Sequence, residues 1–74
     1  MRYAIVIEQT ETGYSAYAPD LPGLGVAGFS IEEVRELISR GIAIYIDELK
    51  SHGERVTKPS AVAEYVKVDF VTSQ

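Results

Sequence analysis

The sequence has no cysteine, no tryptophan and only one histidine among its 74 residues. The absence of cysteine excludes disulfide bonds and thiolate metal ligands, and one histidine is too few for an ordinary zinc site. A chain of this length is near the lower limit for a domain that folds alone. Because neither a disulfide nor a metal can stabilise it, we expect one domain over residues 1–74 that forms a homodimer or a higher homo-oligomer.

Basic residues are also scarce, since seven lysines and arginines stand against eleven acidic residues, for a net charge of −4. Nucleic-acid binding requires neutralised phosphates, so this balance argues against a direct nucleic-acid partner and favours a basic protein partner. No apolar run reaches the length of a membrane span. The apolar N-terminal stretch is interrupted by Glu8 too early for a signal peptide. We therefore expect a cytoplasmic protein without a membrane partner.

The pattern of apolar residues predicts an α+β fold in the order β-β-β-α-β. Alternating or apolar runs predict strands near residues 2–8, 14–18, 24–27 and 64–71. Ser30 followed by Glu33 forms a capping box that predicts the start of a long helix, and Gly53 predicts its end. Gly41 in mid-helix predicts the close approach of another backbone. A single helix covers one face of the small sheet and leaves the other free for self-association.

The ten residues from Tyr14 to Gly23 read Tyr-Ser-Ala-Tyr-Ala-Pro-Asp-Leu-Pro-Gly and are the most informative segment. Pro19 and Pro22 have a fixed φ and no backbone N–H, so neither continues a central strand. Asp20 and Gly23 supply turn chemistry. A stiff, exposed loop of this kind is typical of a recognition surface. The predicted partner-binding residues are Tyr14, Tyr17, Pro19, Asp20, Leu21, Pro22 and Gly23.

The remaining motifs do not predict a catalytic, cofactor-binding or metal-binding site. Residues 23–28 match G-x-G-x-x-G, but Leu24 and Val26 are typical of a strand and the helix begins too late for a dinucleotide site. Acidic residues lie near strand ends and turns without converging on one cleft, and His52 is best interpreted as a helix end. The five tyrosines favour core or interface packing over base stacking. We predict no catalytic, cofactor-binding or metal-binding residue.

Four stretches, in order and spacing, resemble the N-terminal domain of the HicB antitoxin family. They are residues 14–23, 28–33, 45–49, and 53–54 leading to 59–60. The resemblance implies a reduced RNase H-like fold without the nuclease's catalytic acids. It also implies a small antiparallel or mixed four-stranded sheet in the order 3-2-1-4, with the last strand parallel to the first. Members of the family bind and block HicA toxins, which are small basic ribonucleases that act on mRNA.

The chain departs from the family's pattern at Leu24, where cysteine is frequent, and at Val34, where alanine is frequent. It ends at Gln74, so we expect no C-terminal DNA-binding domain of the kind that full-length antitoxins usually carry. The resemblance implies a non-enzymatic antitoxin domain that neutralises a HicA-type mRNA interferase by occluding its surface. Two alternatives stay open, which are a solitary homo-oligomeric adaptor without a toxin and, more remotely, a residual metal-dependent nuclease.

Overall fold

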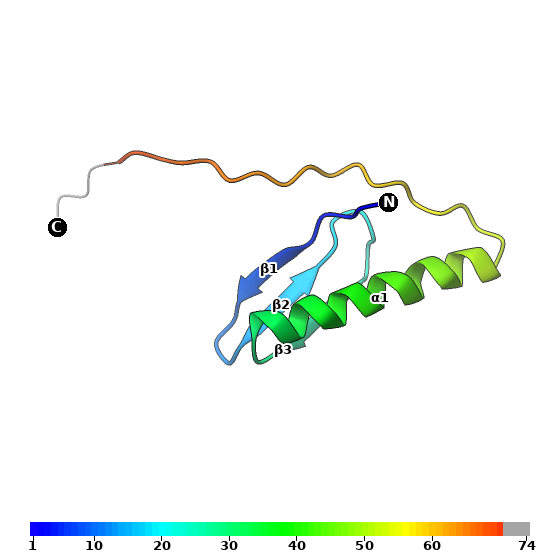
Figure 1. The fold of residues 1–74 in the computed structure, drawn as a ribbon, viewed down its shortest axis with the longest axis horizontal. Helices are drawn as coiled ribbons and strands as arrows, with labels where there is room; N and C mark the ends of the chain where they lie inside the picture. Colours follow the sequence, from blue (N-terminus) through cyan, green and yellow to red (C-terminus); the bar gives the residue numbers. More distant parts are fainter. Residues whose placement is uncertain (71–74) are drawn as a thin grey trace.

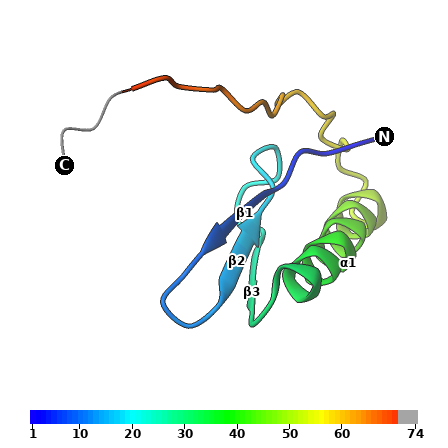
Figure 2. The same ribbon diagram turned by 60° about the vertical axis from the view of Figure 1, so that its left-hand side comes forward.

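A computed structural model describes residues 1–70 and shows a three-stranded antiparallel sheet with one helix on one face (Figure 1; Figure 2). Strands β1 (Val6–Gln9), β2 (Tyr14–Tyr17) and β3 (Gly25–Gly28) precede helix α1 (Ile31–Ser51). The strand order is β1-β2-β3, with β2 in the centre. The structure therefore confirms the α+β class, the helix and the existence of the first three predicted strands, although β1 begins at Val6 and not near residue 2.

The core forms between the central strand and the helix. Ala16 of β2 lies opposite Ile7 of β1 and Val26 of β3, so the three side chains share the face that α1 covers. Val34 and Ile38, one helical turn apart on α1, are fully buried against Ala16. Apolar residues at every second position of the strands thus pack against apolar residues one turn apart on the helix, and together they form one small apolar layer.

The start of α1 is fixed by two side-chain hydrogen bonds. The hydroxyl of Ser30 accepts a hydrogen bond from the backbone N–H of Glu33 at 3.1 Å. The carboxylate of Glu33 accepts one in return from the N–H of Phe29 at 2.7 Å, one residue earlier than in the usual capping box. The structure confirms the predicted helix start.

The helix ends in a Schellman motif around Gly53. The N–H of Gly53 donates to the carbonyl of Lys50 at 3.1 Å, and the N–H of Glu54 donates to the carbonyl of Leu49 at 2.8 Å. Gly53 has a φ of 68°, a left-handed conformation that glycine adopts without strain. His52 Nδ1 lies 2.8 Å from the carbonyl oxygen of Glu48, which confirms its interpretation as a helix-end residue.

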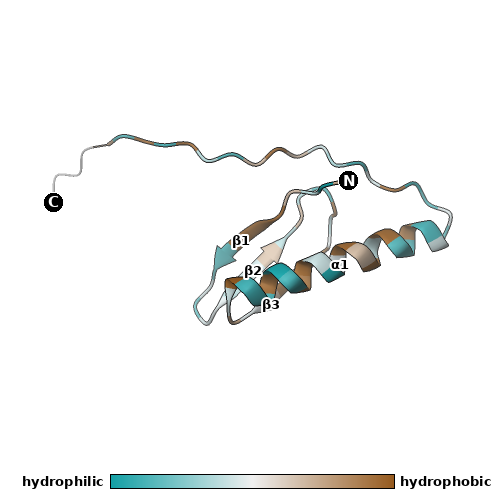
Figure 3. Cartoon of the chain, in the orientation of Figure 1, coloured by the Kyte–Doolittle hydropathy of each residue, from teal (hydrophilic) through white to brown (hydrophobic). Residues whose placement is uncertain are grey.

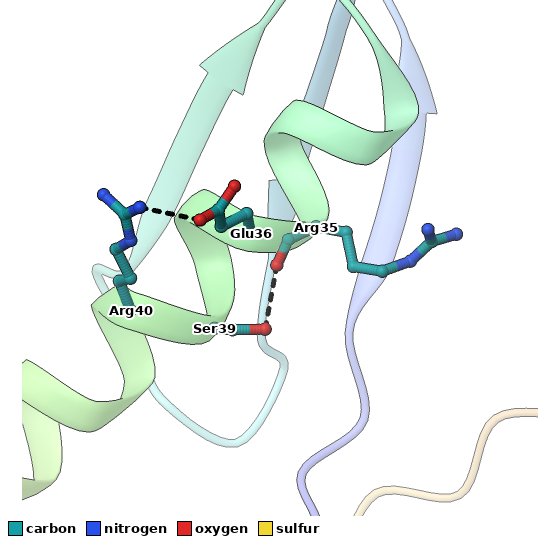
Figure 4. A network of polar contacts seen from close by, with 4 residues as sticks. All are labelled: Arg35, Glu36, Ser39 and Arg40. Carbon is teal, nitrogen blue, oxygen red and sulfur yellow. Dashed lines mark hydrogen bonds and ion pairs between the residues drawn. The ribbon is translucent and has the colours of Figure 1, made fainter.

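The outer face of α1 carries a small polar network (Figure 4). Arg40 forms an ion pair with Glu36 at 2.7 Å, and the hydroxyl of Ser39 donates to the carbonyl of Arg35 at 2.8 Å. Both charged side chains are largely exposed. An exposed pair at this spacing contributes only about 0.3–0.5 kcal/mol, so the fold depends on the apolar face and the caps instead.

After the helix, residues 54–70 form an extended segment, here called the tail, that runs beyond the sheet (Figure 1). The prediction of a fourth strand over 64–71 is wrong for residues 64–70, which form no strand. Residue 71 lies outside the described residues. The four-stranded order 3-2-1-4 and an RNase H-like topology are therefore not shown. Alternating apolar residues predict an extended conformation, but they do not specify which edge the segment pairs with.

The tail gives the molecule an elongated shape. The radius of gyration is 15.5 Å and the longest extent is 57 Å, whereas a compact domain of this length has a radius of gyration of about 11 Å. Hydrophobic residues recur along the tail (Figure 3). Within residues 1–70, no helix has both the length and the apolar character needed to cross a membrane.

We expect the substitution Ser30→Ala to destabilise the domain by about 1 kcal/mol, because it removes the acceptor for the Glu33 N–H. Urea unfolding followed by circular dichroism measures the change. Ser39→Ala is the matched control, since it removes an exposed hydroxyl from mid-helix where alanine is favoured. Equal loss of stability in both variants would contradict the role of the cap.

Candidate partner-binding site

Residues 18–24, here called the proline loop, form two consecutive turns between β2 and β3. The N–H of Leu21 donates to the carbonyl of Ala18 at 3.0 Å, and the N–H of Leu24 donates to the carbonyl of Leu21 at 3.2 Å. The second turn places Pro22 before Gly23, which has a φ of 85°. Proline followed by a residue of positive φ is the signature of a type II turn, so the sequence fixes this shape locally.

The proline loop is anchored by two of its own buried residues and by a hydrogen bond from α1. Ala18 and Leu21 are buried, with Leu21 fully enclosed. The hydroxyl of Tyr45 on α1 donates to the carbonyl of Pro22 at 3.3 Å. These contacts hold the backbone while leaving Pro19, Pro22 and Gly23 exposed. The loop is therefore a rigid projection at one end of the sheet.

Asp20 joins the proline loop to the tail. One oxygen of its carboxylate accepts hydrogen bonds from the backbone N–H groups of Ser60, at 2.9 Å, and Ala61, at 3.1 Å, and the other accepts from the Ser60 hydroxyl at 2.9 Å. The hydroxyl of Tyr3 also donates to the carbonyl of Thr57. We call these bonds the tail clamp. The sequence suggested a turn role and a partner-binding role for Asp20, but not this contact within the chain, because Ser60 lies 40 residues away.

The tail clamp perturbs the acidity of Asp20. Hydrogen bonds from the backbone N–H of Ser60 and then of Ala61 hold the pKa of the Asp20 carboxyl below its ordinary value, and the Ser60 hydroxyl adds to this, while desolvation opposes it. Because these donors favour the ionised carboxylate, the clamp stabilises the structure above the unfolded pKa of about 3.9. That contribution is lost as the pH falls through the lowered folded value.

An apolar groove lies beside the proline loop, on the flank of α1. Its volume is about 330 Å³. We call it the helix groove, and it is lined by Leu24, Gly41, Ile44, Tyr45, Glu48 and Leu49. A Cβ added to Gly41 would lie 2.9 Å from Cδ1 of Leu24. The predicted close approach at Gly41 is therefore to a side chain, and the expectation of a neighbouring backbone is wrong.

The structure divides the seven predicted site residues into three groups. Tyr14 packs against the core on the helix side of the sheet, and Leu21 is fully buried, so both position the loop from within. Tyr17 is 42% exposed, and its position in the alternation places it on the opposite face of the sheet. The remaining four, Pro19, Asp20, Pro22 and Gly23, lie together in the proline loop.

Sequence reasoning missed the helix groove. Its one signal was Ile44, a large apolar residue outside the helical stripe that forms the core, and it is 65% exposed. Within the described residues, no three acidic or histidine side chains gather in a way that could hold a metal ion. The arrangement offers a stiff loop, an adjacent apolar groove and one acid, Glu48, which together form a surface suited to binding a protein.

We expect the amide protons of Ser60 and Ala61 to exchange with solvent faster in the Asp20→Ala variant than in the unchanged chain at neutral pH. Acidification of the unchanged chain below the lowered pKa of Asp20 releases the same amides, because a protonated carboxyl is a weaker acceptor. Hydrogen exchange measured by NMR tests both. Asp47→Ala, at an exposed helix position, is the control. Unchanged exchange in Asp20→Ala would refute the tail clamp.

Comparison with known proteins places the sequence among related proteins. The sequence pattern of the HicB-like antitoxin of bacterial toxin–antitoxin systems matches residues 3–71. A UPF0150 protein of Thermoplasma acidophilum is 34% identical over 62 residues, which cover 82% of this chain and 90% of that protein. A UPF0150 protein of Archaeoglobus fulgidus is 36% identical over 52 residues, covering 69% of this chain and 75% of that protein.

A third relative is longer. An uncharacterised 14.9 kDa protein from the rep-hol intergenic region of Haemophilus phage HP1 is 29% identical over 66 residues, which cover 89% of this chain but 50% of the phage protein. The family match spans nearly the whole chain and includes the proline loop, α1 and the tail. The chain therefore belongs to the family of HicB-like antitoxins of bacterial toxin–antitoxin systems.

Proposed function

We propose that this domain binds a small basic HicA-type mRNA interferase and neutralises it by covering its active surface. The observation that carries the proposal is the family match over residues 3–71, because an antitoxin of a toxin–antitoxin system has a toxin as its partner. The mechanism is steric occlusion and requires no catalytic residue or cofactor in this chain. The domain acts through protein contacts and does not bind nucleic acid directly.

The proline loop and the helix groove supply the proposed contact surface. They are adjacent, since Tyr45 lines the groove and also bonds to Pro22 of the loop. The loop is held by buried Ala18 and Leu21, and the groove is formed largely by regular helix, so little conformational freedom is lost when a partner binds. The exposed prolines and Ile44 offer apolar contact area, and the groove receives a protruding side chain of the toxin.

Charge supports a basic partner. The chain carries a net charge of −4, and α1 contains five acidic residues against three basic ones. In the helix groove, Glu48 stands at the border of an otherwise apolar lining. A lysine or arginine of the toxin can lay its aliphatic stem along Ile44 and Leu49 and direct its charge towards Glu48. Opposite charges of this kind accelerate association and orient the two proteins.

The substitution Ile44→Lys is expected to weaken toxin binding at least tenfold, or about 1.4 kcal/mol, because it places a positive charge opposite the basic toxin and removes apolar contact area. Calorimetric titration with a HicA-type toxin measures the affinity. Phe29→Lys is the matched control, since Phe29 is 82% exposed and follows β3 at the end away from the proline loop. It introduces the same charge and leaves binding unchanged.

Three outcomes contradict the proposal in different ways. Equal weakening by Ile44→Lys and Phe29→Lys places the contact surface elsewhere on the domain. Absence of any complex with the unchanged chain, together with no relief of toxicity on co-expression, rejects the antitoxin role and favours a solitary homo-oligomeric adaptor. Magnesium-dependent RNA degradation that disappears in Asp20→Asn supports the nuclease alternative, and we expect no such activity.

A further inference from the structure

The tail carries large apolar side chains that the rest of the described chain does not cover. Their exposed fractions range from 67% to 102%, for Val62, Tyr65, Val66, Val68 and Phe70. Four of the five occupy even-numbered positions, which lie on one face of an extended segment. No hydrogen bond within residues 1–70 joins residues 62–70 to the domain. Within the described structure, residues 62–70 of the tail are therefore extended, apolar on one face and without a hydrogen-bonded strand partner.

The free edge of the sheet offers the complementary feature. β1 is paired on one side only, with β2, so the outward N–H and C=O groups along its other side lack a strand partner in the described structure. The helix packs mainly over β2 and β3 (Figure 2). As a result Ile5 and Ile7, on the inner face of this edge, are only partly buried. A strand added beside β1 would cover both.

The tail clamp directs the tail away from its own sheet. Tyr3 holds Thr57, and Asp20 holds Ser60 and Ala61, all at the end of the sheet where the N-terminal segment enters β1. Val62 and Ala63 still lie beside residues 2–4, with which they line a shared hollow, and farther along the tail diverges from β1 in both views (Figure 1; Figure 2). Each copy of the chain thus presents one unpaired extended segment and one unpaired edge.

We propose that residues 62–70 of one copy add as a strand to the free edge of β1 in a second copy, and that the second copy does the same in return. Two-fold exchange pairs both tails and both edges and closes the assembly at a dimer. The lengths agree, because nine tail residues span about 30 Å and residues 2–9 span about 27 Å. The valines and Phe70 then cover Ile5 and Ile7 of the partner copy. This inference does not depend on toxin binding.

A second copy fits the tail better than an unrelated protein does, because the same chain supplies both halves of the interaction. An edge strand accepts any extended segment through its backbone, but the match of an apolar tail face to the partly buried Ile5 and Ile7 at this edge is specific. Reciprocal exchange also removes an exposed strand edge that would otherwise template aggregation.

Light scattering on the size-separated full chain should give twice the monomer mass of 8.1 kDa. The proposed backbone hydrogen bonds between the tail and β1 of the second copy are tested by two neighbouring substitutions, Val66→Pro and Lys67→Pro. Alternate residues of a strand direct their N–H groups to opposite sides, so only one of the two prolines removes a hydrogen bond to the partner. We expect the two dimer dissociation constants to differ at least tenfold. Equal constants, or a monomer for the unchanged chain, would overturn the proposal.

A spin label identifies the receiving strand. Because the chain has no cysteine, Lys67→Cys gives a single attachment site for a nitroxide. Labelled chains are mixed with unlabelled chains enriched in ¹⁵N, and the broadening of amide signals is measured in the enriched chains only. Broadening confined to Val6–Gln9 and the residues just before it supports strand exchange. No broadening, or broadening elsewhere, rejects it, and either result leaves the toxin-binding proposal standing.

Discussion

The hydrogen bonds from Ser60 and Ala61 to Asp20 connect the two parts of this small structure. On one side they fix the proline loop, whose turns are already constrained by two prolines and a positive-φ glycine. On the other side they set the point at which the tail leaves the domain. The carboxylate of Asp20 therefore adds to the turns and to buried Leu21 in holding the proline loop, and together with the Tyr3–Thr57 bond it sets the direction of the tail.

The rest of the fold explains why partners are expected. The buried core consists chiefly of Ala16, Val34 and Ile38, with partly buried residues around them. Such a layer gives a domain of this length only marginal stability. The tail adds uncovered apolar surface to a chain without disulfides. We propose that a toxin or a second copy, by binding the folded state, stabilises it by mass action and so compensates for the small core.

Much of the fold could be predicted because its determinants are local. Ser30, Glu33 and Gly53 mark the helix ends through neighbours at most five residues away. The partners of Asp20 could not be predicted, because a hydrogen bond across 40 residues leaves no periodic signal. The tail was wrongly assigned as a paired strand for a related reason, since alternation gives a conformation but not a partner. The different positions of Tyr14 and Tyr17 follow from strand alternation, which places Tyr14 against the core and Tyr17 on the opposite face of the sheet.

The family assignment came from the order of several short stretches, and the sequence comparison confirms it. The proposal that the domain blocks a toxin is tested most directly by an RNA cleavage assay. A purified HicA-type toxin, the proposed partner, is incubated with mRNA and with increasing amounts of the domain. Our account predicts that cleavage stops when the domain saturates the toxin, without degradation of either protein. Undiminished cleavage at saturating concentrations of the domain would contradict it.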